Sequence, residues 1–206
     1  GETAELPGLY QNSHFDLAGF AVGLVDKNKL LPKKNIKESD ILIGLPSNGI
    51  HSNGYSLVRN MFKEKKISYK KKFYSNYSFG DILLKPTLIY VKPILKFISK
   101  FNIKAISHIT GGGISENLVR VLPKNLGAEI QLNQLDFENK KSIFNWLYRK
   151  CNLSQKEMLK TFNCGIGMIL VISKKDLEEF IAHSKKIKQS IKIIGKITKN
   201  KNITFS

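Results

Sequence analysis

The sequence has few cysteines and no long apolar run, and each shortage excludes a class of protein. Cys151 and Cys164 form no CxxC pair, which excludes a disulfide scaffold and is typical of buried thiols in a reducing compartment. No apolar run approaches the roughly 20 residues of a membrane-spanning helix, so we expect no contact with a membrane. No basic-then-apolar leader opens the chain, and we therefore expect a cytoplasmic protein.

Arginine is also scarce, although positive charge is abundant. The chain has 34 Lys and Arg against 16 Asp and Glu, a formal net charge of +18, yet its arginines are Arg59, Arg120 and Arg149. Surfaces dedicated to nucleic acid use arginine for bidentate contacts with phosphate and guanine. Lysine is spread through almost every segment, which favours a proteome-wide bias in amino-acid composition over a dedicated binding surface. We expect no nucleic-acid partner, and a basic nucleic-acid-binding domain is the competing class.

The length and the apolar pattern predict a layered domain. The 206 residues fit one large domain or one domain plus part of another. The interleaving of strands and helices favours an α/β or α+β domain over residues 41–206. Apolar runs predict strands at residues 15–25, 41–46, 105–109, 128–132, 168–173 and 191–197. Helical spacing predicts helices at residues 55–65, 87–100, 115–122, 142–149 and 174–186, and a capping box at Ser154 and Glu157 begins another.

Three segments carry weaker signals. Pro93 removes a backbone hydrogen bond from the helix at 87–100, so we expect a kink or a late start. Residues 66–80 read as a loop with a short strand at most. The polar segment 27–40 is the candidate domain boundary.

Two glycine-bearing loops each lead into a helix. The first is SNGIHSNG at residues 47–54, and the second is TGGG at residues 110–113. Unpaired N–H groups at a helix N-terminus bind phosphate oxygens, and glycine lets the backbone approach the anion. Neither loop is a P-loop or a GxGxxG motif. The alternative interpretation is that both are plain tight turns.

Titratable side chains near these loops add candidate chemistry. The carboxylates of Glu2 and Glu5 could hold Mg²⁺ or form an exposed acidic turn. Asp16, inside an apolar pattern, is a candidate metal ligand or a buried, hydrogen-bonded group. His51 is a candidate general acid or base, or a residue that only shapes its loop.

Five motifs in this order give the chain a family resemblance: GETAELPGLY, FDLAGFAVGLV, SNGIHSNGYSLVR, HITGGGISENLVRVLP and TFNCGIGM. Together they resemble the phosphoribosylformylglycinamidine cyclo-ligase (aminoimidazole ribonucleotide synthetase) family. The resemblance implies an α+β protein. Residues 40–206 would form its layered α/β/α C-terminal domain with a mixed sheet. Residues 1–39 would be the last strands of its ATP-binding N-terminal α+β domain. Because the chain starts at Gly1 inside a motif, we expect a fragment.

The resemblance also implies a reaction. The family phosphorylates the formamide oxygen of formylglycinamidine ribonucleotide with ATP and Mg²⁺, and an amidine nitrogen then closes the imidazole ring. Such catalysis depends mainly on positioning and charge neutralisation. The family forms homodimers, and we expect this chain to be inactive alone. A glutamine-dependent amidotransferase or a kinase of the same superfamily is the alternative, and HSNGYSLVR with TFNCGIGM favours the cyclo-ligase.

The resemblance and the loops together predict the site. Glu2 matches an acidic residue that binds magnesium in the superfamily, and Asp16 is its candidate partner. His51 is the candidate catalytic residue. The candidate substrate- and phosphate-binding residues are Ser52, Asn53, Gly54, Thr110, Gly111, Gly112, Gly113 and Asn117.

Overall fold

The computed structural model describes residues 19–31 and 33–206, and the chain divides into two units, residues 1–30 and 31–206. In the first unit, residues 19–30 contain one short 3-10 turn, η1 (Lys27–Lys29). Phe20, Val22 and Leu24 are exposed there, so the buried strand expected at 15–25 is wrong over residues 19–25. A strand needs a hydrogen-bonded neighbour, and residues 19–30 form no strand pairing. Residues 15–18 lie outside the described part.

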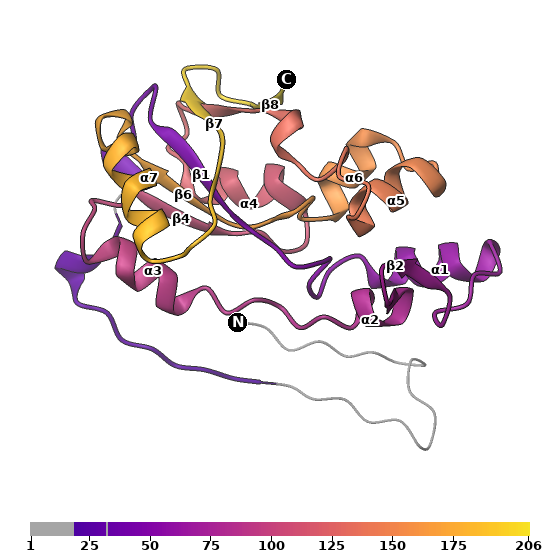
Figure 1. Ribbon diagram of the computed structural model, residues 1–206. Coiled ribbons are helices and arrows are strands. Elements are labelled where there is room, and N and C mark those ends of the chain that lie inside the picture. The colour runs from indigo at the N-terminus through magenta and orange to yellow at the C-terminus, as the bar shows by residue number, and fades with distance from the viewer. Residues whose placement is uncertain (1–18, 32) are drawn as a thin grey trace. The chain divides into compact units, whose positions relative to one another are not determined.

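A six-stranded mixed sheet forms the centre of the second unit (Figure 1). Its order is β4-β6-β1-β7-β5-β8, and every neighbouring pair is antiparallel except the parallel pair β5–β8. The strands are β1 (Ile41–Pro46), β4 (Ala105–His108), β5 (Gly127–Ile130), β6 (Ile166–Ile172), β7 (Lys192–Thr198) and β8 (Ile203–Phe205). The predicted mixed sheet is thereby confirmed.

Helices cover both faces of this sheet, which makes the layered α/β/α arrangement. The helices are α1 (Tyr55–Glu64), α2 (Phe79–Leu83), α3 (Val91–Ile98), α4 (Gly113–Val121), α5 (Ile143–Lys150), α6 (Gln155–Thr161) and α7 (Leu177–Lys186). Short 3-10 turns lie at η2 (Lys33–Asn35), η3 (Leu132–Gln134) and η4 (Lys174–Asp176), and β2 (Lys72–Tyr74) pairs with β3 (Tyr77–Ser78) as a hairpin. Pro93 falls in the first turn of α3, which confirms the late start.

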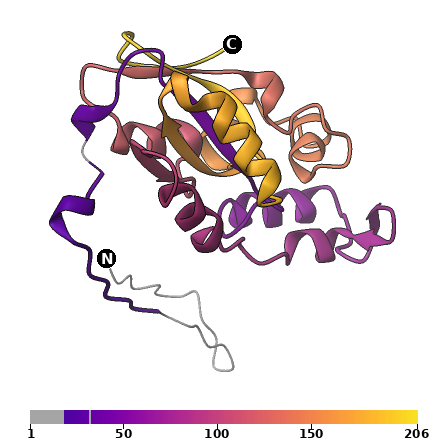
Figure 2. The same ribbon diagram turned by 60° about the vertical axis from the view of Figure 1, so that its left-hand side comes forward.

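The two faces of the sheet have separate cores. On one face α3 and α7 lie side by side (Figure 2). Phe97 of α3 and Phe180 of α7 stack there, with ring centres 4.3 Å apart. The core of the other face takes in α4 and α6 and continues past the end of the sheet to α1, α2 and α5. Residues of β1 alternate between the two, with Leu42 in the larger core and Ile43 in the smaller one.

No helix in the described ranges, 19–31 and 33–206, is both long enough and apolar enough to cross a lipid bilayer.

Candidate functional site

The two glycine loops leave the sheet at the same end. β1 and β4 are both antiparallel to β6, one on each side of it, so they run in the same direction. The first loop follows β1 and the second follows β4. A methyl group built on Gly111 would lie 3.4 Å from Oδ1 of Asn53, which shows that the loops are in contact. The two loops therefore meet at one end of the sheet, beyond the last residues of β1 and β4.

In the second loop, two of the three glycines are required by the backbone. Gly112 and Gly113 have φ of +88° and +61°, in the left-handed region that favours glycine. A Cβ on Gly113 would also collide with the carbonyl oxygen of Leu159 in α6. Gly111 has neither constraint. Gly113 is therefore explained by packing, whereas Gly111 has an exposed face that is free to meet a ligand.

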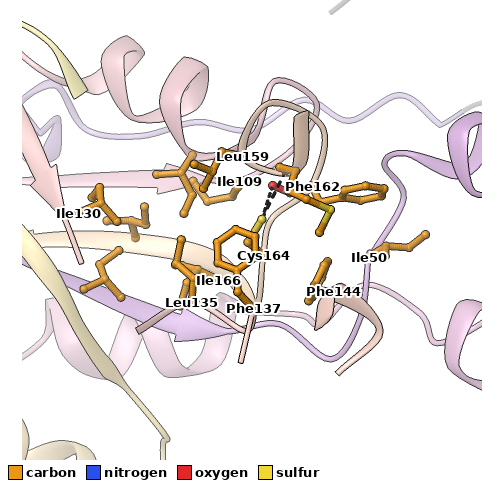
Figure 3. Close-up of a cluster of buried hydrophobic side chains, with 14 of the residues drawn as sticks. Ile50, Ile109, Ile130, Leu135, Phe137, Phe144, Leu159, Phe162, Cys164 and Ile166 are labelled. Carbon is orange, nitrogen blue, oxygen red and sulfur yellow. Dashed lines mark hydrogen bonds between the residues drawn. The ribbon is translucent and has the colours of Figure 1, made fainter. Parts of the chain in front are cut away.

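The first loop ends in the same way. Gly54, the N-cap of α1, has φ of +82°, and a Cβ there would run into the ring of Phe162. The carbonyl of Phe162 lies close to Gly113 as well. Phe162 is fully buried in the cluster that Figure 3 shows beside Ile109 and Leu159. Phe162 thus contacts both loops, the first through its ring and the second through its backbone carbonyl.

Asn117, in α4, holds the second loop from behind. Its Nδ2 donates to the carbonyl oxygens of Gly113 at 2.8 Å and Gly111 at 3.0 Å. Its Oδ1 accepts a hydrogen bond of 3.1 Å from the hydroxyl of Thr110. Asn117 is buried, and these bonds occupy its amide. The structure therefore gives Asn117 a positioning role in place of the expected ligand contact.

His51 lies under the first loop, with only 4% of its surface exposed and a left-handed φ of +55°. Its Nε2 donates to Oδ1 of Asn48 at 3.0 Å, and within the described part of the chain its buried Nδ1 has no partner. Burial lowers the pKa of His51, and the nearby His108 lowers it further. A neutral, buried imidazole favours the second of our alternatives, in which His51 shapes the loop.

The remaining polar side chains form the rim of the site. Ser52 is exposed, and its hydroxyl lies 3.3 Å from that of Thr87. Asn53 and Thr110 are half-buried. Beside Gly112 a pocket of about 450 Å³ opens between α4 and α6, and Lys156 and Lys160 line it. The start of α4 therefore has Lys156, Lys160 and the carboxylate of Glu116 beside it, and Ser52 and Asn53 lie at the start of α1.

Asn163 is a site residue that sequence reasoning missed. Its Oδ1 accepts hydrogen bonds from the hydroxyl of Ser47 at 2.8 Å and from the N–H of Gly165 at 2.9 Å. Its Nδ2 donates to the carbonyl of Gly49 at 2.9 Å. Asn163 therefore ties the first loop to the turn before β6. The available signal was a polar residue between the apolar Phe162 and Cys164.

Cys164 is part of the buried support (Figure 3). Its thiol donates to the carbonyl oxygen of Met158 at 3.4 Å. Burial raises the pKa of Cys164, and the carboxylate of Asp136 raises it further. Burial likewise raises the pKa of Cys151 to about 11. Both thiols therefore stay protonated at neutral pH, which suits structural rather than nucleophilic cysteines.

The expected metal ligands, Glu2 and Asp16, lie outside the described residues. Within residues 19–31 and 33–206 no group of three His, Cys, Asp or Glu side chains could hold a metal ion. The assignment of Mg²⁺ to Glu2 and Asp16 stays a prediction.

Sequence comparison identifies relatives of the whole described domain. Residues 37–206 match the family model described as AIR synthase related protein, C-terminal domain. The chain is 49% identical over 201 residues to phosphoribosylformylglycinamidine cyclo-ligase of Alkaliphilus oremlandii, covering 96% of the chain and 58% of that protein. It is 46% identical to the protein of the same name from Methylobacillus flagellatus, covering 86% of the chain and 50% of the relative. The chain thus spans a little over half the length of these relatives.

Solved structures show the same fold at low identity. The Escherichia coli hydrogenase maturation protein HypE aligns with a TM-score of 0.59 and 16% identity over 89% of the chain and 50% of HypE. Thiamine-monophosphate kinase of Stenotrophomonas maltophilia aligns with a TM-score of 0.55 and 12% identity, over 83% of the chain and 51% of the kinase. These likenesses concern the fold alone.

Proposed function

The chain belongs to the AIR synthase related family, and from this premise we propose that it is the C-terminal part of a phosphoribosylformylglycinamidine cyclo-ligase. The proposed reaction is the ATP-dependent closure of formylglycinamidine ribonucleotide to 5-aminoimidazole ribonucleotide. Its setting would be purine biosynthesis in the cytoplasm. The curated relatives at 45–49% identity support the activity by their names.

The observation that carries this proposal is the contact between the two glycine loops. Gly54 and Gly112 precede α1 and α4 without a capping side chain, and the loops touch between Gly111 and Asn53. Free N–H groups and the positive ends of two helix dipoles thus gather on one side, where they favour phosphoryl oxygens. Ser52 and Asn53 add neutral polar groups at the same rim, whereas the hydroxyl of Thr110 already donates to Asn117.

Each part of the loops would have a distinct role in the reaction. The formamide oxygen becomes a leaving group only after it receives the γ-phosphoryl of ATP, and phosphate leaves when the amidine nitrogen attacks. Backbone N–H groups at the loops would orient and neutralise the transferred phosphoryl group. Asn117, His51 and Asn163 would hold the loops in place without touching it. Because the ring of His51 is neutral and buried, it would position rather than transfer protons.

ATP and Mg²⁺ are proposed from the sequence resemblance. Bound Mg²⁺ would neutralise charge on the phosphates of ATP, and Glu2 and Asp16 are its proposed ligands. We also propose that the longer relatives form homodimers and that this chain alone does not turn over. No turnover is expected because the chain spans only 50–58% of the length of these relatives.

A glycine-to-alanine pair tests the phosphate-binding loop. Gly111→Ala adds a methyl group on the exposed side of the loop with ordinary contacts, the nearest atom being Oδ1 of Asn53 at 3.4 Å. We expect it to weaken binding of ATP, measured by calorimetry, about tenfold through loss of one charge-assisted hydrogen bond to the phosphoryl group. Its urea midpoint should stay unchanged.

Gly80→Ala, in α2, is the matched control, because its new methyl group would also lie 3.4 Å from the nearest atom, the carbonyl oxygen of Tyr69. It should change neither affinity nor stability. Equal affinities for the wild type and Gly111→Ala would show that the loop is not the anion site.

A further inference from the structure

A small polar pocket lies at the beginning of the first loop, away from the contact with the second loop. Its volume is about 160 Å³, and its polar lining includes Ser47, Asn48, Lys85, Asp136, Asn139 and Lys141. The segment that lines it, residues 47–49, precedes Asn53, whose side chain lies beside Gly111 of the second loop. The first loop therefore borders both this pocket and, further along the chain, the second loop.

We propose that this pocket binds a single phosphoryl group, the 5′-phosphate of the ribonucleotide substrate. The identity of that substrate rests on the proposed function. The presence of an anion pocket rests only on the residues described below.

Two lysines from different connecting segments supply the positive charge: Lys85 lies between α2 and α3, and Lys141 precedes α5. The ammonium group of Lys85 lies 5.3 Å from the ring centre of Tyr77, and that of Lys141 lies 5.1 Å from the ring centre of Tyr74. Both tyrosines belong to the β2–β3 hairpin, so this hairpin restrains both cations beside the pocket. Neither lysine forms an ion pair with a carboxylate in the described part of the chain.

The one carboxylate in the lining is already neutralised. Oδ1 of Asp136 accepts a hydrogen bond of 2.8 Å from the ammonium of Lys192, which lies outside the pocket lining. Lys85 and Lys141 therefore leave an excess of positive charge. A divalent anion would balance this excess.

The neutral groups in the wall are largely occupied by the protein itself. Asn48 bonds to His51 and to the carbonyl of Pro86, and Oδ1 of Asn139 accepts from the N–H of Lys141. The hydroxyl of Ser142 caps α5 by accepting from the N–H of Phe144. The lysines are therefore the groups available to a ligand. The small volume admits one phosphoryl group but not a whole nucleotide.

Charge removal at and beside the pocket provides the test. The probe is ribose 5-phosphate, titrated into the chain and its variants at about 150 mM salt, with affinity read from NMR chemical shifts. Lys141→Met and Lys85→Met should each weaken binding about tenfold, the effect of one charge-assisted hydrogen bond. Asn139→Asp should weaken it similarly, because it keeps the acceptor for Lys141 and adds a negative charge.

Lys140→Met is the matched control, since it removes the same charge one residue away and does not line the pocket. It should change affinity less than about twofold, as expected for an exposed charge in salt. Equal losses in Lys140→Met and Lys141→Met would overturn the pocket in favour of the diffuse field of the +18 chain. Unchanged affinity in Lys85→Met and Lys141→Met would overturn it too.

Two further arms identify the source of the phosphoryl group. Ribose 5-phosphate should bind at least as tightly as inorganic phosphate, and ATP should not compete with it. Competition by ATP that is lost in Lys141→Met would assign the pocket to a phosphate of ATP. It would overturn the assignment to the 5′-phosphate of the ribonucleotide substrate. Failure of Gly111→Ala to weaken ATP binding would count against the proposed function while leaving this pocket intact.

Discussion

Helices α2, α5 and α6 begin differently from α1 and α4. Ser78, Ser142 and Ser154 cap the first three with their hydroxyls, and Asp81 and Glu157 close capping boxes in α2 and α6. Hydrogen bonds from the serine hydroxyls and backbone hold the pKa values of Asp81 and Glu157 below their usual range. Gly54 and Gly112 instead precede α1 and α4 in left-handed conformations, without a capping side chain.

The difference separates closed helix ends from open ones. A serine cap occupies an N–H group that would otherwise be unpaired, so that end is satisfied within the chain. At the two glycine N-caps no side chain occupies these groups, although the N–H of Gly113 donates to the carbonyl of Thr110. Both glycine-led helices follow loops at the same end of the sheet, beyond β1 and β4. The fold therefore places its open ends together.

The largest expected effect comes from adding a side chain where the start of α4 packs closely against the backbone of α6. Gly113→Ala forces a left-handed alanine and drives its methyl group into the carbonyl of Leu159. We expect the free energy of unfolding to fall by about 3 kcal/mol or more, measured by urea denaturation. Gly80→Ala should leave it unchanged. A loss below about 1 kcal/mol would show that the loop can shift to accept a side chain.

A smaller loss is expected at a closed helix end. Ser154→Ala removes the hydroxyl that accepts from the N–H of Glu157, and should lower the free energy of unfolding by about 1 kcal/mol. ATP affinity should be the same as in the wild type, in contrast to Gly111→Ala. If Ser154→Ala also weakened ATP binding, the distinction between open and closed ends would not hold.

The smallest effect is a pH dependence that arises from the first loop. Because the pKa of His51 is lowered on folding, its neutral form is favoured in the native state. Its contribution to stability is therefore complete above the unfolded pKa of about 6.5 and is lost as pH falls toward the folded value. Urea midpoints at pH 7.5 and 5 should differ less in His51→Gln than in the wild type. An equal pH dependence in both proteins would contradict this assignment.

Much of the second unit could be predicted from local pattern. The strand at residues 41–46, the helix beginning at Tyr55, and the capping box of Ser154 and Glu157 follow from apolar period and cap residues within a few positions. The short elements α2 and β8 were missed, because five and three residues give too little periodicity. The boundary predicted between residues 39 and 40 stays a prediction.

The site could be predicted only in part. Both glycine loops were found from sequence, but Asn163 was not, because its hydrogen bond to Ser47 joins residues 116 positions apart. Asn117 was identified as a ligand, whereas the structure places its amide behind the loop. Sequence indicates that a residue is polar but not on which side of a loop its side chain lies.

The sequence by itself determined the interleaved strands and helices, the excess of lysine, and the two glycine loops at helix starts. These properties depend on neighbouring residues and on composition. Only the tertiary structure decided that the loops meet, that Phe162 contacts both, and that Lys85 and Lys141 border one pocket. The physical reason is the strand order, because pairing β1 and β4 on either side of β6 brings together residues that no local pattern connects.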